Sequence, residues 1–557
     1  MLISDFNLPL INAFIMKLIY KSYFVQFVLL IIVFGQVGCN KDFLNQQPLA
    51  QLSQATFWNS SSDALLALTG IYQGSDVGDA SYTNDDLILG SDTDDSGYKN
   101  GAVGLIYSGY FQASDAQVVG AVWTRAYKAI YRANYFLENI DKVQMDATLK
   151  AQYIAEARFL RAYEYFYMSV LYGGVPLVTK TLTIAEANSQ TRNTLKEVQD
   201  YAISECTAAA ADLPAARPDG EKGRILKGAA LGIAGRLLMI QQKWPEAAAV
   251  YKQIIDLNTY ILDPRYKEIF EEAGEGSKEI LLSVNCVASL YGNTHNQRNY
   301  HPDFYGGYQE DNIYQGLVDA YECTDGLPIG ESPLYDPQHP FEHRDPRMYA
   351  TIFLPGYTVF RGKLFPADPA STKIATLIGA TRYGWKKFVT ETYAGDNGSS
   401  GDDIILMRYA EVLLGYLEST LESGGAITQS LLDAIINKVR GRSAVNMPAV
   451  TETDPDKLRA LVQNEDRVEI ATEGLIRYMS IRRWGIYQQV INTVFYGMKL
   501  TDDPANYTDY KVAKTGPYAG HLISLDKTGT VKQGWDLIPI PQSERDINSA
   551  LTQNPDY

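Results

Sequence analysis

The sequence is poor in the residues on which many enzymes and disulfide scaffolds depend. Its 557 residues include only four cysteines and five histidines. Cys39 stands apart near the N-terminus, and the other three, Cys206, Cys286 and Cys323, are an odd number, so the pattern indicates no disulfide framework. Cys206 and Cys286 lie in apolar segments, where a thiol is more often a buried filler than a nucleophile.

Motifs for catalysis are also missing. The only close histidine pair is HPFEH, His339 to His343, and its Pro340 disfavours the helix that a two-histidine zinc site needs. The sequence has neither a GxSxG elbow nor a P-loop. Its 65 acidic residues offer many carboxylate pairs, but nothing singles out two of them for glycoside hydrolysis. We therefore expect no catalytic residue, no metal and no cofactor.

Positive charge is in deficit. Lysine and arginine number 49 against 65 acidic residues, which gives a net charge of -16. This balance argues against a general nucleic-acid binder and against attraction to anionic lipid headgroups.

The longest apolar run, Phe24 to Phe34, is too short to span a bilayer. It follows Lys17 and Lys21 and precedes Gly38 and Cys39, a pattern typical of a bacterial lipoprotein signal. We predict a signal peptide over residues 1–38, with lipidation of Cys39 as the membrane anchor. Translation starts at either Met1 or Met16, and Met16 fits a charged n-region better.

Helical segments are abundant. Ala151 to Leu177 is apolar or aromatic on almost every side, which predicts a central helix that ends at Gly173 and Gly174. Arg224 to Gln242 is rich in small residues and is followed, after a short break, by a second helix with Pro245 in its first turn. This pair is typical of a tetratricopeptide unit. Further helices are predicted over 123–140, 402–425, 430–443 and 457–484, with one starting near Ser62.

Two loop segments favour ligand binding. Tyr291 to Tyr314 and Asp92 to Gly101 combine tyrosines with amides, carboxylates and glycines, and a sugar suits flat rings beside planar polar groups. Packing explains any single ring equally well, and Asp92, Asp94 and Asp95 would alternatively suit calcium. The candidate ligand-binding residues are Asp94, Asp95, Tyr98, Asn100, Tyr110, Asn296, Tyr300, Tyr305 and Tyr308.

Seven stretches together resemble a known family. They are CNKDFL at the lipidation site, EARFLRAYEYFYMSVLYGGVPL, KGAALGIAGRLLM with KWPEAAAVYKQII, LMRYAEVLLGYLEST, INKVRGR, EGLIRYMSIRRWG, and LIPIPQSE with QNPDY. In this order they are similar to the SusD/RagB outer-membrane lipoproteins of Bacteroidetes. The resemblance implies a mostly α fold with four tetratricopeptide-like helix pairs in an α-α superhelix, a few short strands, and an irregular ligand-facing part. We divide the mature chain into 39–262, with helical repeats, and 263–557, with the ligand loops and further repeat helices.

The resemblance also implies a function. Such proteins lie on the cell surface over a SusC-like TonB-dependent transporter of the outer membrane, to which they deliver a captured glycan. We therefore expect a non-catalytic glycan-binding lipoprotein with no nucleic-acid partner. Two alternatives remain open: a peptide binder like RagB, and a surface glycoside hydrolase.

Overall fold

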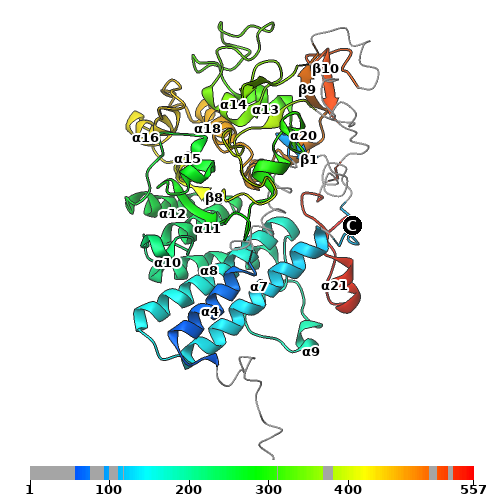
Figure 1. Cartoon of the computed structure of the whole chain (residues 1–557). Coiled ribbons are helices and arrows are strands. Elements are labelled where there is room, and N and C mark those ends of the chain that lie inside the picture. The colour runs from blue at the N-terminus through cyan, green and yellow to red at the C-terminus, as the bar shows by residue number, and fades with distance from the viewer. Residues whose placement is uncertain are drawn as a thin grey trace, which may run out of the picture. The chain divides into compact units, whose positions relative to one another are not determined.

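Helices that follow one another in the chain also pack on one another. The computed structural model describes residues 57–75, 93–98, 111–116, 118–309, 311–367, 381–500, 511–524, 531–532 and 534–557. Ser60–Tyr557 form one compact unit and residues 1–59 another. Within the larger unit each helix of the following series contacts the next: α7 (Val119–Asn139), α8 (Ala147–Tyr172), α10 (Leu195–Asp212), α11 (Lys227–Ile240), α12 (Trp244–Asp256), α15 (Tyr409–Glu422) and α18 (Pro455–Glu469). This series confirms the mostly α fold with a helical superhelix (Figure 1).

The predicted central helix is α8, and α4 (Ser61–Tyr72), α7 and α10 pack against it. It begins four residues earlier than predicted because the side chain of Asp146 accepts a hydrogen bond from the backbone N–H of Leu149. Nearly every side chain from Ala155 to Tyr172 is buried. The charged residues on this helix find partners on its neighbours: Glu156 pairs with Arg217 at 2.7 Å and accepts a hydrogen bond from the Tyr72 hydroxyl at 2.6 Å. The helix is therefore surrounded on all sides, as its sequence predicts.

The tetratricopeptide-like pair α11 and α12 shows why small residues are needed. Tyr251 of α12 is buried, and its ring lies 2.7 Å from where a Cβ on Gly235 of α11 would stand. The same ring lies 2.8 Å from the equivalent position on Gly415 of α15. Real Cβ contacts are never so short, so glycine lets three helices close around one tyrosine.

The predicted helix over 402–425 is wrong in its first part. Ile404–Arg408 form strand β8, which pairs antiparallel with β2 (Ile280–Val284), and helix α15 starts only at Tyr409. A short continuous apolar run such as IILM cannot be assigned by periodicity. Two further predicted helices are each divided: 430–443 into α16 (Gln429–Ala434) and α17 (Ile436–Arg440), and 457–484 into α18 and α19 (Ile476–Arg483).

The described residues of the segment 263–401 form only short helices and strands. Its strands form antiparallel pairs, either with one another or with strands elsewhere in the chain. The remaining elements are β1 (Ser96–Tyr98), α9 (Ile184–Ala187), β3 (Asp311–Ile313), α13 (Gln315–Ala320), α14 (Pro346–Thr351), β4 (Ile352–Phe353), β5 (Val359–Phe360), β6 (Lys363–Leu364), β7 (Gly384–Trp385), α20 (Tyr487–Ile491), β9 (Phe495–Lys499), β10 (His521–Ser524) and α21 (Gln542–Ile547).

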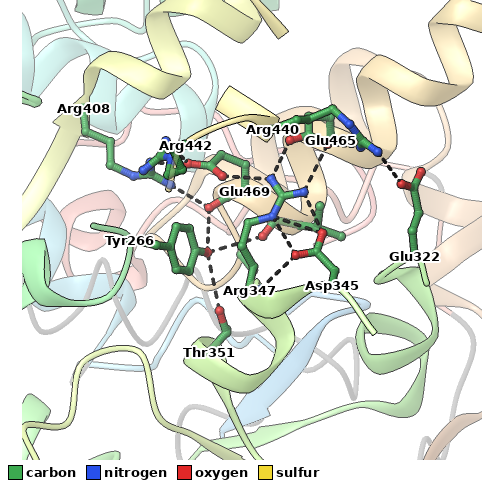
Figure 2. Close-up of polar contacts among 12 residues, drawn as sticks. Tyr266, Glu322, Asp345, Arg347, Thr351, Arg408, Arg440, Arg442, Glu465 and Glu469 are labelled. Atoms are coloured by element: carbon green, nitrogen blue, oxygen red, sulfur yellow. Dashed lines mark hydrogen bonds and ion pairs between the residues drawn. The ribbon is translucent and has the colours of Figure 1, made fainter. Parts of the chain in front are cut away.

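A buried network of charges joins these elements to α18 (Figure 2). Glu469 of α18 is fully buried and accepts hydrogen bonds from Arg408 at 2.7 Å, Arg442 at 2.7 Å and Arg347 at 2.9 Å. Glu465, one turn earlier, pairs with Arg347 and with Arg440. Because each charge has several partners, the network fixes α18 relative to β8, α14 and α17.

The C-terminal tail packs back on the helices. The Ile538 N–H donates to the Leu171 carbonyl at 2.8 Å, and the Asn554 amide donates to the Tyr172 carbonyl at 3.0 Å. Cys206 and Cys286 are buried, as predicted, and Cys323 is also buried. None of the helices in the described ranges is long and apolar enough to cross a membrane. The division at 262/263 stays a prediction.

Candidate functional site

The two predicted ligand segments, far apart in the sequence, meet in the fold. Strand β1 pairs antiparallel with β3, with Ser96 opposite Ile313 and Tyr98 opposite Asp311. The Tyr314 N–H extends the pairing by donating to the Asp95 carbonyl at 2.8 Å. The early and late predicted ligand segments therefore lie side by side where β1 pairs with β3.

The acidic pair of the first segment is occupied by arginines. Asp94 binds Arg477 of α19 with both carboxylate oxygens, at 2.9 and 2.6 Å, and Asp95 lies 2.5 Å from Arg467 of α18. Burial alone would raise the pKa of Asp94, but Arg467 and Arg477 outweigh it and lower that pKa to about 2. Both carboxylates are buried, pair with guanidinium groups and anchor β1, and their contact with a ligand stays a prediction.

The alternative of a calcium site at these acids gains no support. Among the described residues, no three His, Cys, Asp or Glu side chains are grouped closely enough to hold a metal. Two arginines directly beside Asp94 and Asp95 would also repel a cation.

Two residues of the second segment are also buried. Tyr300 is 1% exposed and stacks on Trp385, with 4.5 Å between ring centroids. Asn296 is 4% exposed and lies in a π-helical turn, His295–Asn299, where its N–H donates to the Asn293 side chain. Both side chains are buried in this conformation, and their contact with a ligand stays a prediction. Aromatic packing placed Tyr300 in the core.

Tyr305 is half-buried. Its ring packs against Phe353, Phe360 and Phe365, at centroid distances of 5.8, 5.2 and 6.0 Å. Its hydroxyl donates to the Lys363 carbonyl at 3.0 Å. Burial raises the pKa of Tyr305 to about 12. The residue mainly supports the loop that carries it.

Among the candidate residues whose side chains the structure describes, Tyr308 is the one that is exposed. Its side chain is 49% exposed, and the Arg298 guanidinium stands 4.6 Å from the ring centroid and donates to the hydroxyl at 3.1 Å. The Tyr308 N–H donates to the Arg298 carbonyl at 2.8 Å. Two contacts to one residue hold the ring in a fixed orientation, so it presents a rigid flat surface beside a charged donor.

A second exposed ring, Tyr291, lies on a turn that is connected to Arg298 through the segment 396–400. Tyr291 is 55% exposed at the end of a tight turn in which its N–H donates to the Val287 carbonyl. Gly292, which follows Tyr291, packs closely on the segment 396–400, because a Cβ added to Gly292 would lie 2.6 Å from Ser399 Cα. In the same segment, a Cβ added to Gly398 would lie 3.8 Å from Arg298 Nη1. The segment 396–400 therefore contacts both the turn of Tyr291 and the side chain of Arg298. Tyr291 is the first residue of the predicted segment, and Arg298 lies inside it. The sequence does not distinguish these two residues from their buried neighbours, and only their exposure in the structure does.

The remaining predicted residues are only partly visible or lie elsewhere. Tyr98 takes part in β1 through its backbone. Asn100, Tyr110 and Cys39 lie outside the described residues. Arg467 and Arg477, which anchor the site, were missed because no local pattern links them to residues almost four hundred positions earlier.

Comparison with known proteins agrees with this architecture. The model of the SusD family matches residues 278–557, and one described as starch-binding, associating with the outer membrane, matches residues 42–239. A SusD-like carbohydrate-binding protein from Bacteroides fragilis is 35% identical, with a TM-score of 0.82 over 89% of this chain and all of that one. SusD-like protein P25 of Formosa agariphila is 23% identical over 84% of this chain and 91% of its own length.

A solved surface glycan-binding protein A from Bacteroides fluxus shares the fold at 19% identity, with a TM-score of 0.67 over 90% of this chain and all of that one. The SusD family model covers half of the chain, and a structural relative is more than 30% identical over most of it. Both findings assign the chain to the same family. The chain belongs to the SusD/RagB family.

Proposed function

We propose that this protein binds a glycan at the cell surface, through the platform formed by Tyr308, Arg298 and Tyr291. The observation that carries the proposal is the exposed Tyr308 ring held by Arg298. A sugar ring stacks its C–H face on such an aromatic surface, while its hydroxyls accept from guanidinium donors. The names of the relatives from B. fragilis and B. fluxus, a carbohydrate-binding and a surface glycan-binding protein, support the same ligand class.

The site suits a glycan more than a charged peptide. The carboxylates of Asp94 and Asp95 in the first segment pair with Arg467 and Arg477, so they are already engaged and do not offer sites for a cationic peptide group. The platform offers two exposed tyrosine rings and one cation, and exposed flat rings suit the C–H faces of a polymer lying across the surface.

The finer parts of the proposal concern location and partner. We place the chain at the outer membrane, anchored through a lipid on Cys39, where it passes its glycan to a SusC-like TonB-dependent transporter. The family description of association with the outer membrane supports this location. The protein would act by binding alone, without cleaving the glycan.

Native gels that contain dissolved polysaccharides test the proposal. We expect at least one of starch, laminarin, xylan or mannan to retard the protein, and Tyr308→Ala to abolish the retardation. Tyr357→Ala is the matched control, because this tyrosine is similarly exposed at 42% but packs elsewhere, against Tyr349. Retardation that survives Tyr308→Ala would overturn the platform, and release of reducing sugar would overturn the absence of catalysis.

A further inference from the structure

A second group of aromatic side chains lies on helix α7, away from the platform. Trp123, Tyr127 and Tyr131 follow one another at four-residue spacing and therefore share one face of the helix. All three line a pocket of about 340 Å³. Tyr131 is 53% exposed, and its ring is stacked nearly parallel to that of Tyr135. A large exposed ring at the mouth of an aromatic pocket points to a ligand.

The opposite walls come from two other segments. Pro176, Val178 and Leu182, which follow α8, form one wall, and Ile547 and Leu551 from the C-terminal segment form another. The C-terminal segment is fixed in place: the Asn548 amide donates to the Gln190 carbonyl at 2.7 Å, and the Gln542 N–H donates to the Ala113 carbonyl at 2.7 Å. Hydrogen bonds on both sides hold the pocket open in a preformed shape.

The rim of the pocket is polar. Glu544 is half-buried, and its carboxylate takes no hydrogen bond or ion pair from any residue that the structure describes. Burial raises the pKa of Glu544. The exposed side chain of Asn188 adds an amide at the rim, whereas Lys180 is already paired with Glu186 at 2.8 Å. A carboxylate left partly desolvated beside aromatic rings is costly unless a ligand supplies donors.

We propose that this pocket is a second saccharide site, which takes one or two sugar units or the end of a chain. The C–H face of the sugar would pack on Tyr131 and Tyr127, neighbouring hydroxyls would donate to Glu544, and the Asn188 amide would bond a further hydroxyl. A lipid tail would leave Glu544 without donors. The volume is at the lower end of the range for small-molecule sites, which limits the ligand to a short saccharide. The assignment of a saccharide as the ligand rests on the proposed function, whereas the assignment of the pocket as a binding site does not.

Calorimetric titration of the full mature chain tests the inference, with oligosaccharides of laminarin, starch, xylan and mannan as probes. We expect two binding events per chain. Tyr131→Ala and Glu544→Gln should each weaken one of them by roughly tenfold or more, as for a binding hot spot, and Tyr308→Ala should remove the other. Tyr357→Ala should change neither. Circular dichroism of each variant checks that it is folded, and Glu544→Gln preserves the size of the side chain.

The outcomes separate the two sites. One binding event that Tyr308→Ala removes, with Tyr131→Ala and Glu544→Gln unchanged, would overturn the second site and leave the proposed function standing. One event that depends on Tyr131 and Glu544 but not on Tyr308 would overturn the platform and support the pocket. The absence of any binding event with these four sugars would overturn both.

Discussion

The Glu469→Gln variant tests how far the buried charge network stabilises the protein. Glu469 has no exposed surface, and its two carboxylate oxygens accept from Arg408, Arg442 and Arg347 (Figure 2). Glutamine has almost the same shape but no charge, and its amide NH2 would point donors at a guanidinium group. The substitution therefore leaves three buried cations short of one negative charge without creating a cavity.

Removal of one partner from a buried ion pair costs about 3 to 5 kcal/mol. Since proteins are stable by about 5 to 15 kcal/mol, the variant should lose about a fifth or more of its free energy of unfolding. Burial alone would raise the pKa of Glu469, but Arg442, Arg408 and Arg347 outweigh it and hold the pKa well below its usual range. Because the pKa of Glu469 is lower in the folded protein than its value of about 4.3 in the unfolded chain, the charged carboxylate stabilises the fold above that pH. The difference in free energy of unfolding between wild type and variant should therefore be largest near neutral pH and should shrink below about pH 4.

Urea unfolding followed by circular dichroism measures the difference in free energy between wild type and variant. Glu422→Gln is the control, because Glu422 pairs with Arg459 at 2.6 Å near the surface and should cost below about 1 kcal/mol. If Glu469→Gln cost as little as Glu422→Gln, or if its deficit were unchanged at low pH, the network would not stabilise the fold as reasoned.

Three further predictions concern the scaffold. Phe159→Ala should cost about 3 to 5 kcal/mol in urea unfolding, because Phe159 is fully buried in α8, while retardation by glycan stays as in wild type; altered glycan preference would contradict its structural role. Gly235→Ala should lower the free energy of unfolding by about 1 to 3 kcal/mol, since the new Cβ would meet the Tyr251 ring at 2.7 Å; higher stability, as helix propensity alone predicts, would refute the close approach. Burial raises the pKa of Asp466 to about 6 against the opposing charge of Arg483. Wild type should therefore gain free energy of unfolding from pH 8 to pH 5, as Asp466 becomes protonated, and Asp466→Asn should not. Equal pH profiles of the two proteins in urea unfolding would contradict this.

The helical scaffold could be predicted from the sequence because its signals are local. The apolar run of α8 and its ending at Gly173, with φ +77°, are visible within one segment. The small residues of α11 likewise indicate a close approach before the partner, Tyr251, is known. Strand β8 was missed because four apolar residues in a row suit a buried strand and a buried helix equally.

The candidate site could be predicted only as two regions. Composition identified the segments that β1 and β3 join, but composition does not show which side a side chain faces. Tyr300 and Tyr308 lie in the same segment, yet the first stacks on Trp385 in the core and the second is exposed. The pairing of Asp94 with Arg477 depends on tertiary contact across almost the whole chain, which no local pattern reveals.

Hydrogen exchange of the full chain, with and without a polysaccharide that retards it, tests the central claim most directly. We predict that the bound glycan slows exchange in the backbone amides of residues 287–309, which carry Tyr291, Arg298 and Tyr308. Bound glycan that leaves these amides unchanged, while it protects another part of the chain outside the α7 pocket, would contradict the account.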